Sequence, residues 1–209
     1  MIPRYQTILF VVLLAASVIM GTVLWNLRER AHQRLLQGVY STPTQAPQVA
    51  PAEQATLMVA NDSDNSVLAR ILSLPLPQNP EARARAVLGK LLDLYAAPDA
   101  THPVPGGVAS ITQVFLVPIA DAGGKTAQNG PELAVVNLTG AFAASHPSGL
   151  ETETLTVLSI CATLHANLPR VTEVRFLVDG QPRATLAGHA DLTRTYLTAE
   201  AGPAEGARQ

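Results

Sequence analysis

The chain has 209 residues, of which 47% are hydrophobic, 14% are charged and only 4% are aromatic, and its formal net charge is −2 at pH 7. Acidic side chains outnumber basic ones after residue 54, and few aromatic rings are available for base stacking, so the composition argues against binding to nucleic acid. The single cysteine, Cys161, excludes an intramolecular disulfide.

Residues 8–25 form an apolar run that contains no charged side chain. A helix of this length spans roughly 27 Å, close to the hydrocarbon thickness of a bilayer. We therefore expect a transmembrane helix over 8–25, after a short N-terminal segment over 1–7. A cleaved secretory signal normally has a shorter apolar core and small residues at its cleavage site, whereas the segment after Trp25 is bulky and charged. An uncleaved signal anchor is therefore expected, and a buried core helix of this length is disfavoured.

Residues 26–54 are expected to form a juxtamembrane helix followed by a proline-rich linker. Leu27, Ala31 and Leu35 recur at helical spacing and make a narrow apolar stripe. This stripe is either part of a solvated helical turn or a short seam for self-association. Three prolines and almost no charge in the following stretch indicate an extended connection.

A folded domain is predicted over residues 55–198, and its first half contains several clear patterns. Residues 55–60 favour a strand that ends in a polar turn, and residues 67–77 favour an extended segment. Pro80 stands at a favourable first position of a helix, whose apolar residues recur at helical spacing until Pro98 ends it. Residues 111–119 and 132–138 are rich in β-forming residues and predict a hairpin with a long glycine-rich tip.

The second half of the domain predicts one helix and another hairpin. The helix opens at Gly149, carries acidic residues in its first turn, and stops before Pro169. Residues 171–178 alternate as a strand does, and Asp179-Gly180 is a strong hairpin-turn signal, so residues 181–187 are expected to return as a strand. Residues 199–209 are expected to be a disordered tail. The pattern predicts an α+β, two-layer domain with a small mixed or antiparallel sheet covered by two main helices.

Few residues suggest chemistry in this domain, and we expect no catalytic, cofactor or metal site. Cys161 and His165 stand one helical turn apart, which would permit a nucleophile and base pair. His189 with Asp191 could supply two metal ligands, but zinc sites need three or four. A small membrane-tethered enzyme or ligand-binding domain that uses Cys161, His165 or His189 is the alternative to a non-enzymatic domain.

Residues 133–191 resemble the GerMN domain of bacterial sporulation and germination proteins. The similarity rests on AVVNLTGAF at 134–142, on TLHANL at 163–168, and on the pattern ending in FLVDG at 176–180, followed by GHAD at 188–191. It extends more weakly over about 55–195. Asn137, Thr139, Phe142, Asp179 and Gly180 match its motifs, and we interpret them as structural, with Phe142 as a core residue.

The resemblance implies a non-enzymatic, extracytoplasmic domain with an interaction or scaffolding role at the cell envelope. Its expected partners are the membrane, through residues 8–25, and an envelope protein or the cell wall, and a homo-oligomer is a further possibility. The chain lacks the cysteine that anchors related lipoproteins, and the expected signal anchor takes its place. Arg28, Arg30 and Arg34 follow the anchor and weakly favour a cytoplasmic domain, whereas the resemblance favours export, which is the orientation that we expect.

Overall fold

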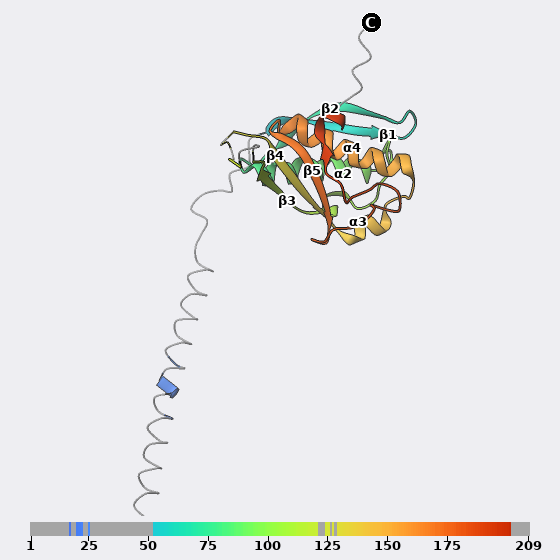
Figure 1. Cartoon of the computed structure of the whole chain (residues 1–209). Coiled ribbons are helices and arrows are strands. Elements are labelled where there is room, and N and C mark those ends of the chain that lie inside the picture. The colour runs from blue at the N-terminus through green and yellow to red at the C-terminus, as the bar shows by residue number, and fades with distance from the viewer. Residues whose placement is uncertain are drawn as a thin grey trace, which may run out of the picture. The chain divides into compact units, whose positions relative to one another are not determined.

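The computed structural model describes residues 52–120, 124, 125, 127 and 129–201, together with residues 17, 20–22 and 25 (Figure 1). The predicted segment 1–7, most of the predicted helix 8–25, most of the segment 26–54, and residues 202–209 lie outside the described residues. Within the described part of the chain, no helix is long and apolar enough to cross a bilayer. The chain divides into two compact units, residues 1–48 and 49–209, and the second unit contains the folded domain.

The domain begins with a hairpin of two antiparallel strands, β1 (Ala52–Asn61) and β2 (Ser66–Pro75). The turn between them is built by short polar side chains: the carboxylate of Asp64 accepts hydrogen bonds from the backbone N–H and hydroxyl of Ser66. Both strands start slightly before the predicted ranges. β1 is the more buried strand, because its residues pack on the helices while much of β2 faces solvent.

Helix α2 (Pro80–Tyr95) follows the hairpin, as predicted from its proline and its apolar spacing. Asn79 caps the helix, since its side-chain oxygen accepts a hydrogen bond from the Ala82 N–H at 2.9 Å. The buried face of α2 includes Leu88, Leu91 and Tyr95. A short 3₁₀ turn, η1 (Gly107–Ser110), then leads into the next sheet.

The second sheet has four strands in the order β3 (Ile111–Pro118), β4 (Glu132–Leu138), β5 (Val171–Val178) and β6 (Tyr196–Leu197). β4 pairs antiparallel with β3 and parallel with β5, and β5 pairs antiparallel with β6. The predicted hairpin over 111–138 and the predicted strand 171–178 are therefore confirmed. The sheet is mixed because β4 reaches β5 through helices, which a parallel connection requires.

Two helices connect β4 to β5: the short α3 (Gly140–Ser145) and the long α4 (Leu150–Asn167). α4 lies where its acidic first turn and its apolar spacing predicted. α3 was not predicted, because its six residues are too few to show a helical period. It is capped by Thr139, whose hydroxyl accepts a hydrogen bond from the Phe142 N–H, and it buries Phe142 in the core as expected.

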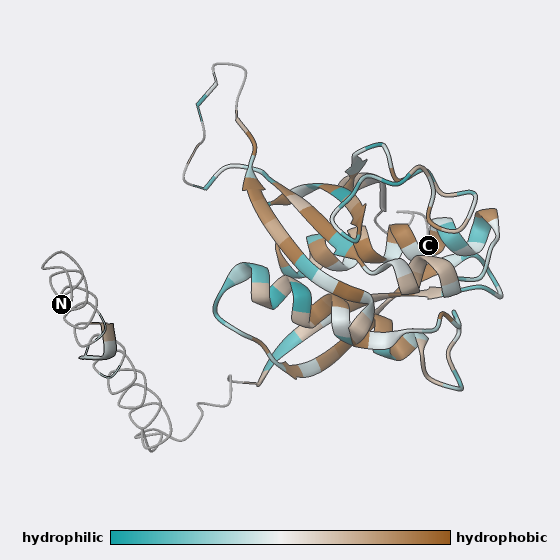
Figure 2. Cartoon of the chain, turned by 90° about the horizontal axis from the view of Figure 1, so that it is seen from below, coloured by the Kyte–Doolittle hydropathy of each residue, from teal (hydrophilic) through white to brown (hydrophobic). Residues whose placement is uncertain are grey.

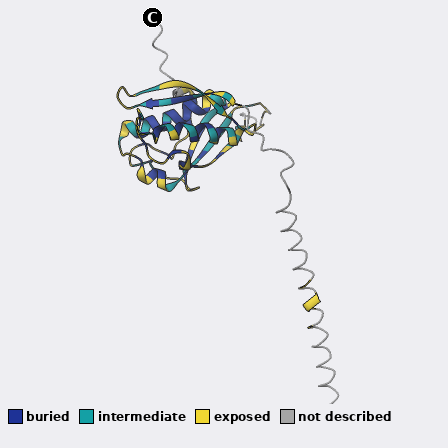
Figure 3. Cartoon of the chain, turned by 180° about the vertical axis from the view of Figure 1, so that it is seen from behind, coloured by how far each residue is buried: buried dark blue, intermediate teal, exposed yellow. Residues whose placement is uncertain are grey.

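The prediction of one sheet covered by two helices was incomplete. α4 packs against the four-stranded sheet, and β1 of the separate hairpin borders it on a further side (Figure 1). Figure 3 shows α4 dark blue along most of its length, which agrees with burial on more than one side. The α+β class is confirmed, but α2 and α4 contact the separate hairpin as well as the four-stranded sheet.

The hydrogen bonds that join α4 to the hairpin explain this arrangement. No strand of the described residues pairs with the outer edge of β1, and α4 supplies hydrogen bonds there instead. The Thr163 hydroxyl accepts the Met58 N–H at 2.8 Å, and the Asn167 side chain both accepts from the Thr56 N–H and donates to the Thr56 carbonyl. An uncovered edge strand would present unpaired backbone groups. Polar residues on α4 therefore substitute for a neighbouring strand.

The prediction that residues 181–187 return as a strand was wrong. Asp179 and Gly180 do form the tight turn, with positive φ angles of 50° and 75°, but only Gln181 bridges back to Val178. The following residues bend away, and β6 takes the place beside β5. The predicted tail also starts later, because residues 199–201 belong to a 3₁₀ turn, η2 (Thr198–Ala201).

Candidate functional site

The most polar part of the domain interior surrounds Thr156 on α4. Its hydroxyl oxygen lies 2.7 Å from Nε2 of His102 and 2.8 Å from Nε2 of His146. All three side chains are at least 95% buried. The other ring nitrogen of His102 pairs with the carboxylate of Asp62 in the β1–β2 turn, and that of His146 lies 2.8 Å from the carbonyl oxygen of Pro147. One hydroxyl therefore links segments that are far apart in the sequence.

The hydrogen-bond partners of Thr156 and the two histidines indicate which ring nitrogen of His146 carries a proton. Pro147 offers only a carbonyl oxygen, so His146 donates from Nδ1. Burial lowers the pKa of His146, the largest influence on that group, so its Nε2 is unprotonated and accepts the Thr156 hydroxyl proton. The same hydroxyl lies 3.1 Å from the Thr152 carbonyl oxygen of the preceding turn, so its single proton faces two acceptors. Nε2 of His102 is placed to donate to the Thr156 oxygen, and Nδ1 of His102 faces the carboxylate of Asp62.

The lowered pKa of His146 has a measurable consequence for stability. Unfolding exposes the ring, and its pKa returns to the ordinary value of 6.5. Just below that pH the unfolded protein therefore binds a proton at His146 that the folded protein does not bind. Folding stability should therefore fall as pH drops through this range, although His102, Glu153 and Asp62 all act on the ring. The variant His146→Gln should show a shallower decrease when melting temperatures are compared between neutral and mildly acidic buffers. Equal slopes in the two proteins would contradict this assignment.

A second polar cluster lies one turn earlier on α4, around Glu153. This carboxylate is fully buried and accepts hydrogen bonds from the backbone N–H groups of Ala187, His189 and Ala190 at 2.9–3.0 Å. Its other oxygen accepts the Gly149 N–H and lies 3.0 Å from Nδ1 of His189. Burial alone would raise the pKa of Glu153, but these hydrogen bonds lower it from 4.5 to about 2.

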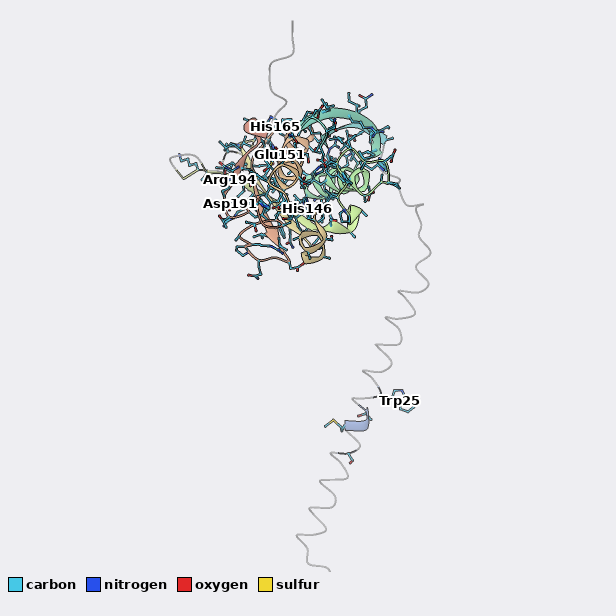
Figure 4. The ribbon with its side chains drawn as sticks, turned by 90° about the vertical axis from the view of Figure 1, so that its right-hand side faces the viewer. Trp25, His146, Glu151, His165, Asp191 and Arg194 are labelled. Atoms are coloured by element: carbon cyan, nitrogen blue, oxygen red, sulfur yellow. The ribbon has the colours of Figure 1, made fainter. Side chains whose placement is uncertain are left out.

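This carboxylate holds the end of the segment that was expected to return as a strand. The N–H of Ala187, the last residue of that segment, and those of His189 and Ala190 just beyond it are turned toward Glu153. The segment is held further by Tyr196, whose hydroxyl donates to the Asp191 carbonyl at 2.6 Å, and Arg194 lies over the Tyr196 ring. Figure 4 shows Asp191 and Arg194 close together beside α4. Glu153 therefore fixes the path of the chain after β5.

The structure does not bring Cys161, His165 and His189 together. Cys161 is fully buried in the middle of α4, and no hydrogen bond joins it to either histidine among the described residues. His165 lies in the last turn of α4, where its ring is 3.1 Å from the Val171 carbonyl, and His189 is bound to Glu153 near the first turn. Glu153, which binds His189, and His165 lie near opposite ends of the 18-residue α4. At a rise of about 1.5 Å per residue, these two positions on the helix are more than about 15 Å apart.

Cys161 is also poorly suited to act as a nucleophile. Burial raises the pKa of its thiol to about 12, and only the thiolate is reactive. A thiol reagent such as 5,5′-dithiobis(2-nitrobenzoate) should therefore leave the native protein unlabelled and label it once denaturant unfolds the domain. Rapid labelling of the native protein, at a rate that denaturant does not increase, would contradict the buried position of Cys161.

A hollow of about 180 Å³ lies between the hairpin and the end of α2. Its walls combine apolar and polar residues: Val59, Arg70, Leu94, Tyr95, Ala97, Asp99, Ala100 and Thr101. None of Cys161, His165 or His189 lines it. Among the described residues, no group of three or more histidine, cysteine, aspartate or glutamate side chains is placed to hold a metal ion.

Sequence reasoning did not identify the residues that form these two clusters. Glu153 was interpreted only as a favourable charge in the first turn of a helix, and His102 lies in a loop without any motif. The partners of Thr156 come from positions 54 and 10 residues away in the chain. Such contacts have no local period, and the weak available signal was a polar residue, Thr156, one turn before Ile160 of the apolar face of α4.

The fold and these clusters define a small α+β domain whose buried polar groups hold its own loops in place. The chain belongs to the Germane family, whose description is sporulation and spore germination, because the family model matches residues 56–184. This match covers more than half of the chain and agrees with the resemblance drawn from the motifs of residues 133–191. No curated protein matches the chain.

Solved structures of low sequence identity are also similar to the domain. The tandem GerMN domains of the sporulation protein GerM from Bacillus subtilis are 15% identical, with 71% of this chain and 47% of that chain covered and a TM-score of 0.41. The first GerMN domain alone is 16% identical over 71% of this chain and 98% of its own, with a TM-score of 0.41. A putative lipoprotein from Clostridium perfringens is 17% identical over 75% and 95%, with a TM-score of 0.33. The chain thus spans about half the length of the tandem protein.

Proposed function

We propose that this protein is a membrane-anchored interaction or scaffolding protein of the bacterial cell envelope, without enzymatic activity, and that its domain lies outside the cytoplasm. The observation that carries the proposal is the family match over residues 56–184. The apolar run 8–25 supplies the anchor in this proposal, and residues 26–51 connect it to the domain. The partner is an envelope protein or the cell wall.

The arrangement of polar groups supports a binding role over a catalytic one. Catalytic acids, bases and nucleophiles need access to a substrate and pKa values near the working pH. Here Thr156 and Glu153 are fully buried and bound to the protein's own groups, and the thiol of Cys161 is protonated. If cellular function survives the single changes Cys161→Ala, His165→Ala and His189→Ala, the enzyme alternative fails. Loss of function in one of them, with folding intact, would contradict the proposal.

Membrane anchoring is tested by extraction of isolated membranes at alkaline pH, which releases peripheral proteins. The full chain should remain in the membrane pellet. The double variant Leu14→Arg/Val18→Arg should move to the supernatant, because each charge near the centre of a spanning helix costs about 3 kcal/mol. Leu14→Ile/Val18→Ile is the matched control and should stay in the pellet. Release of the unmodified full chain would mean that residues 8–25 do not anchor it.

A further inference from the structure

The outer face of the four-stranded sheet, which no helix of the described residues covers, is rich in apolar side chains. Residues paired across adjacent strands point to the same face, so the register separates an inner set, such as Val114, Val136 and Phe176, from an outer set. The inner set is buried in the core. Figure 2 shows β3 and β4, which lead to the grey loop, brown along much of their length. Six outer positions are apolar: Phe115, Val117, Leu133, Val135, Leu177 and Leu197.

Several of these side chains are substantially exposed. Phe115 is 39% exposed, Val117 45% and Leu197 48%. The solvent face of such a sheet is usually polar, since strands alternate apolar and polar residues when one face meets water. Contiguous apolar surface bounded by polar residues is typical of an interaction site.

The outer face carries two neighbouring rows with the same pattern. One row, across β3, β4 and β5, is Val117, Leu133 and Glu173. The adjacent row is Phe115, Val135 and Arg175. Each row has two apolar residues followed by a charge, and the two charges are opposite in sign.

We propose that this face, which we call the outer β3–β5 face (Phe115, Val117, Leu133, Val135, Glu173 and Arg175), pairs with the same face of a second copy of this chain. A two-fold axis that runs across the strands, between the two rows, places each row over the other row of the partner. Apolar residues then meet apolar residues, and Glu173 of each copy meets Arg175 of the other. Such a symmetric contact is self-complementary, as a two-fold interface requires.

The charges of Glu173 and Arg175 favour this occupant because neither side chain has a partner in the described part of the domain. No ion pair or hydrogen bond through the side chain of Glu173 or Arg175 occurs among the described residues, although nearby Arg170 and Glu132 form a pair at 2.6 Å. Two sheets that stack face to face are about 10 Å apart, which lets their side chains interdigitate. Two reciprocal ion pairs would then border the apolar contact.

Pairing through the outer edge of β3, the alternative way to extend this sheet, is obstructed. Side chains of α2 already occupy that edge: the Glu81 carboxylate accepts the Leu116 N–H at 3.3 Å, and the Arg85 Nε donates to the Ile111 carbonyl at 3.4 Å. A neighbouring strand would have to displace both side chains. The face, and not this edge, is therefore available to a second copy.

The test is a charge-reversal cycle on the full chain in an uncharged detergent, read by sedimentation velocity over a range of concentrations. The unmodified chain should be a dimer. Glu173→Arg and Arg175→Glu should each raise the dimer dissociation constant about tenfold or more, because each change places like charges together at two symmetric positions. The double variant Glu173→Arg/Arg175→Glu should restore the dimer. Arg183→Glu, on an exposed loop, is the control with the same charge change and should have no effect.

Two variants that replace exposed apolar side chains, one on the outer β3–β5 face and one away from it, complete the experiment. Phe115→Asp should dissociate the dimer, whereas Leu68→Asp on the exposed β2 strand should not, and circular dichroism should show that both are folded. A monomeric unmodified chain, or a dimer that no outer-face variant weakens, overturns the proposal. Dissociation by Leu68→Asp alone would assign pairing to the hairpin instead. Pairing needs neither a membrane nor an envelope partner, so its failure is distinct from failure of the proposed function.

Discussion

Replacement of Glu153 by glutamine is expected to lower the free energy of unfolding by about 3 kcal/mol or more. The carboxylate accepts hydrogen bonds from three backbone N–H groups of residues 187–190, and all its acceptor positions face donors. Glutamine keeps the size but turns an NH₂ group toward these donors and removes the charge. The segment after β5 should loosen, and chemical denaturation monitored by circular dichroism measures the loss.

Glu151→Gln is the matched control for this change, because Glu151 lies in the same first turn but is exposed. It should alter stability by less than about 1 kcal/mol. A loss of the same size in both variants would show that the charge acts on the helix end and not through the loop contacts.

The pH dependence of stability gives an independent measure of the same carboxylate. Its pKa is about 2 in the folded protein and 4.5 ordinarily, so its contribution is complete above about 4.5 and is lost as pH falls toward 2. The difference of about 2.5 units corresponds to roughly 3 kcal/mol. Glu153→Gln should lack this part of the acid dependence and otherwise follow the unmodified protein.

Replacement of Thr156 by valine is expected to have the second large effect, a loss of about 3–5 kcal/mol. Valine has nearly the same shape but leaves Nε2 of His102 and of His146 buried without a partner. Each unpartnered buried group costs about 1–3 kcal/mol. The links from α4 to the loop after α2, through His102, and to the loop before α4, through His146, would be lost together. Thermal denaturation at neutral pH provides the measurement.

Two further substitutions separate the hydroxyl from the methyl group. Thr156→Ser retains the oxygen and should recover most of the stability. Thr154→Val makes the same chemical change at a partly buried position on the same helix and should cost much less. If Thr156→Val and Thr154→Val have equal effects, the contacts of the Thr156 hydroxyl with His102 and His146 do not contribute to stability.

The sequence was sufficient for the elements that carry a strong local signal. Pro80 and a long apolar period located α2, acidic residues after Gly149 located α4, and alternation located β5. The short α3 was missed because six residues show no helical period. The strand at 55–60 and the extended segment at 67–77 were predicted, but a local pattern does not show that they pair as a separate sheet. The prediction of a returning strand after Gly180 was wrong, and a distant side chain, Glu153, binds the backbone N–H of Ala187 at the end of that segment and those of His189 and Ala190 beyond it. Local turn chemistry predicted the turn correctly but could not predict these contacts.

The same physical reason limited prediction of the candidate site. The residues that the sequence suggested, Cys161, His165 and His189, are conspicuous because of their chemistry. In the fold, Cys161 is buried, His165 lies in the last turn of α4, and His189, from the segment after β5, lies beside the first turn of α4. Glu153 and Thr156 are buried polar groups with several hydrogen-bond partners, but in the sequence nothing distinguished them from the other residues of a predicted helix. Their importance arises only from long-range contacts, which a periodicity cannot reveal.

The central claim, that the domain works outside the cytoplasm as part of the cell envelope, is tested most directly by a topology reporter. Alkaline phosphatase, which is active only outside the cytoplasm, is fused after Gln209 of the full chain and expressed in bacteria. The account predicts strong phosphatase activity from this fusion and no signal from a cytoplasmic reporter at the same site. The reverse pattern would contradict it, because Arg28, Arg30 and Arg34 would then have retained the domain in the cytoplasm.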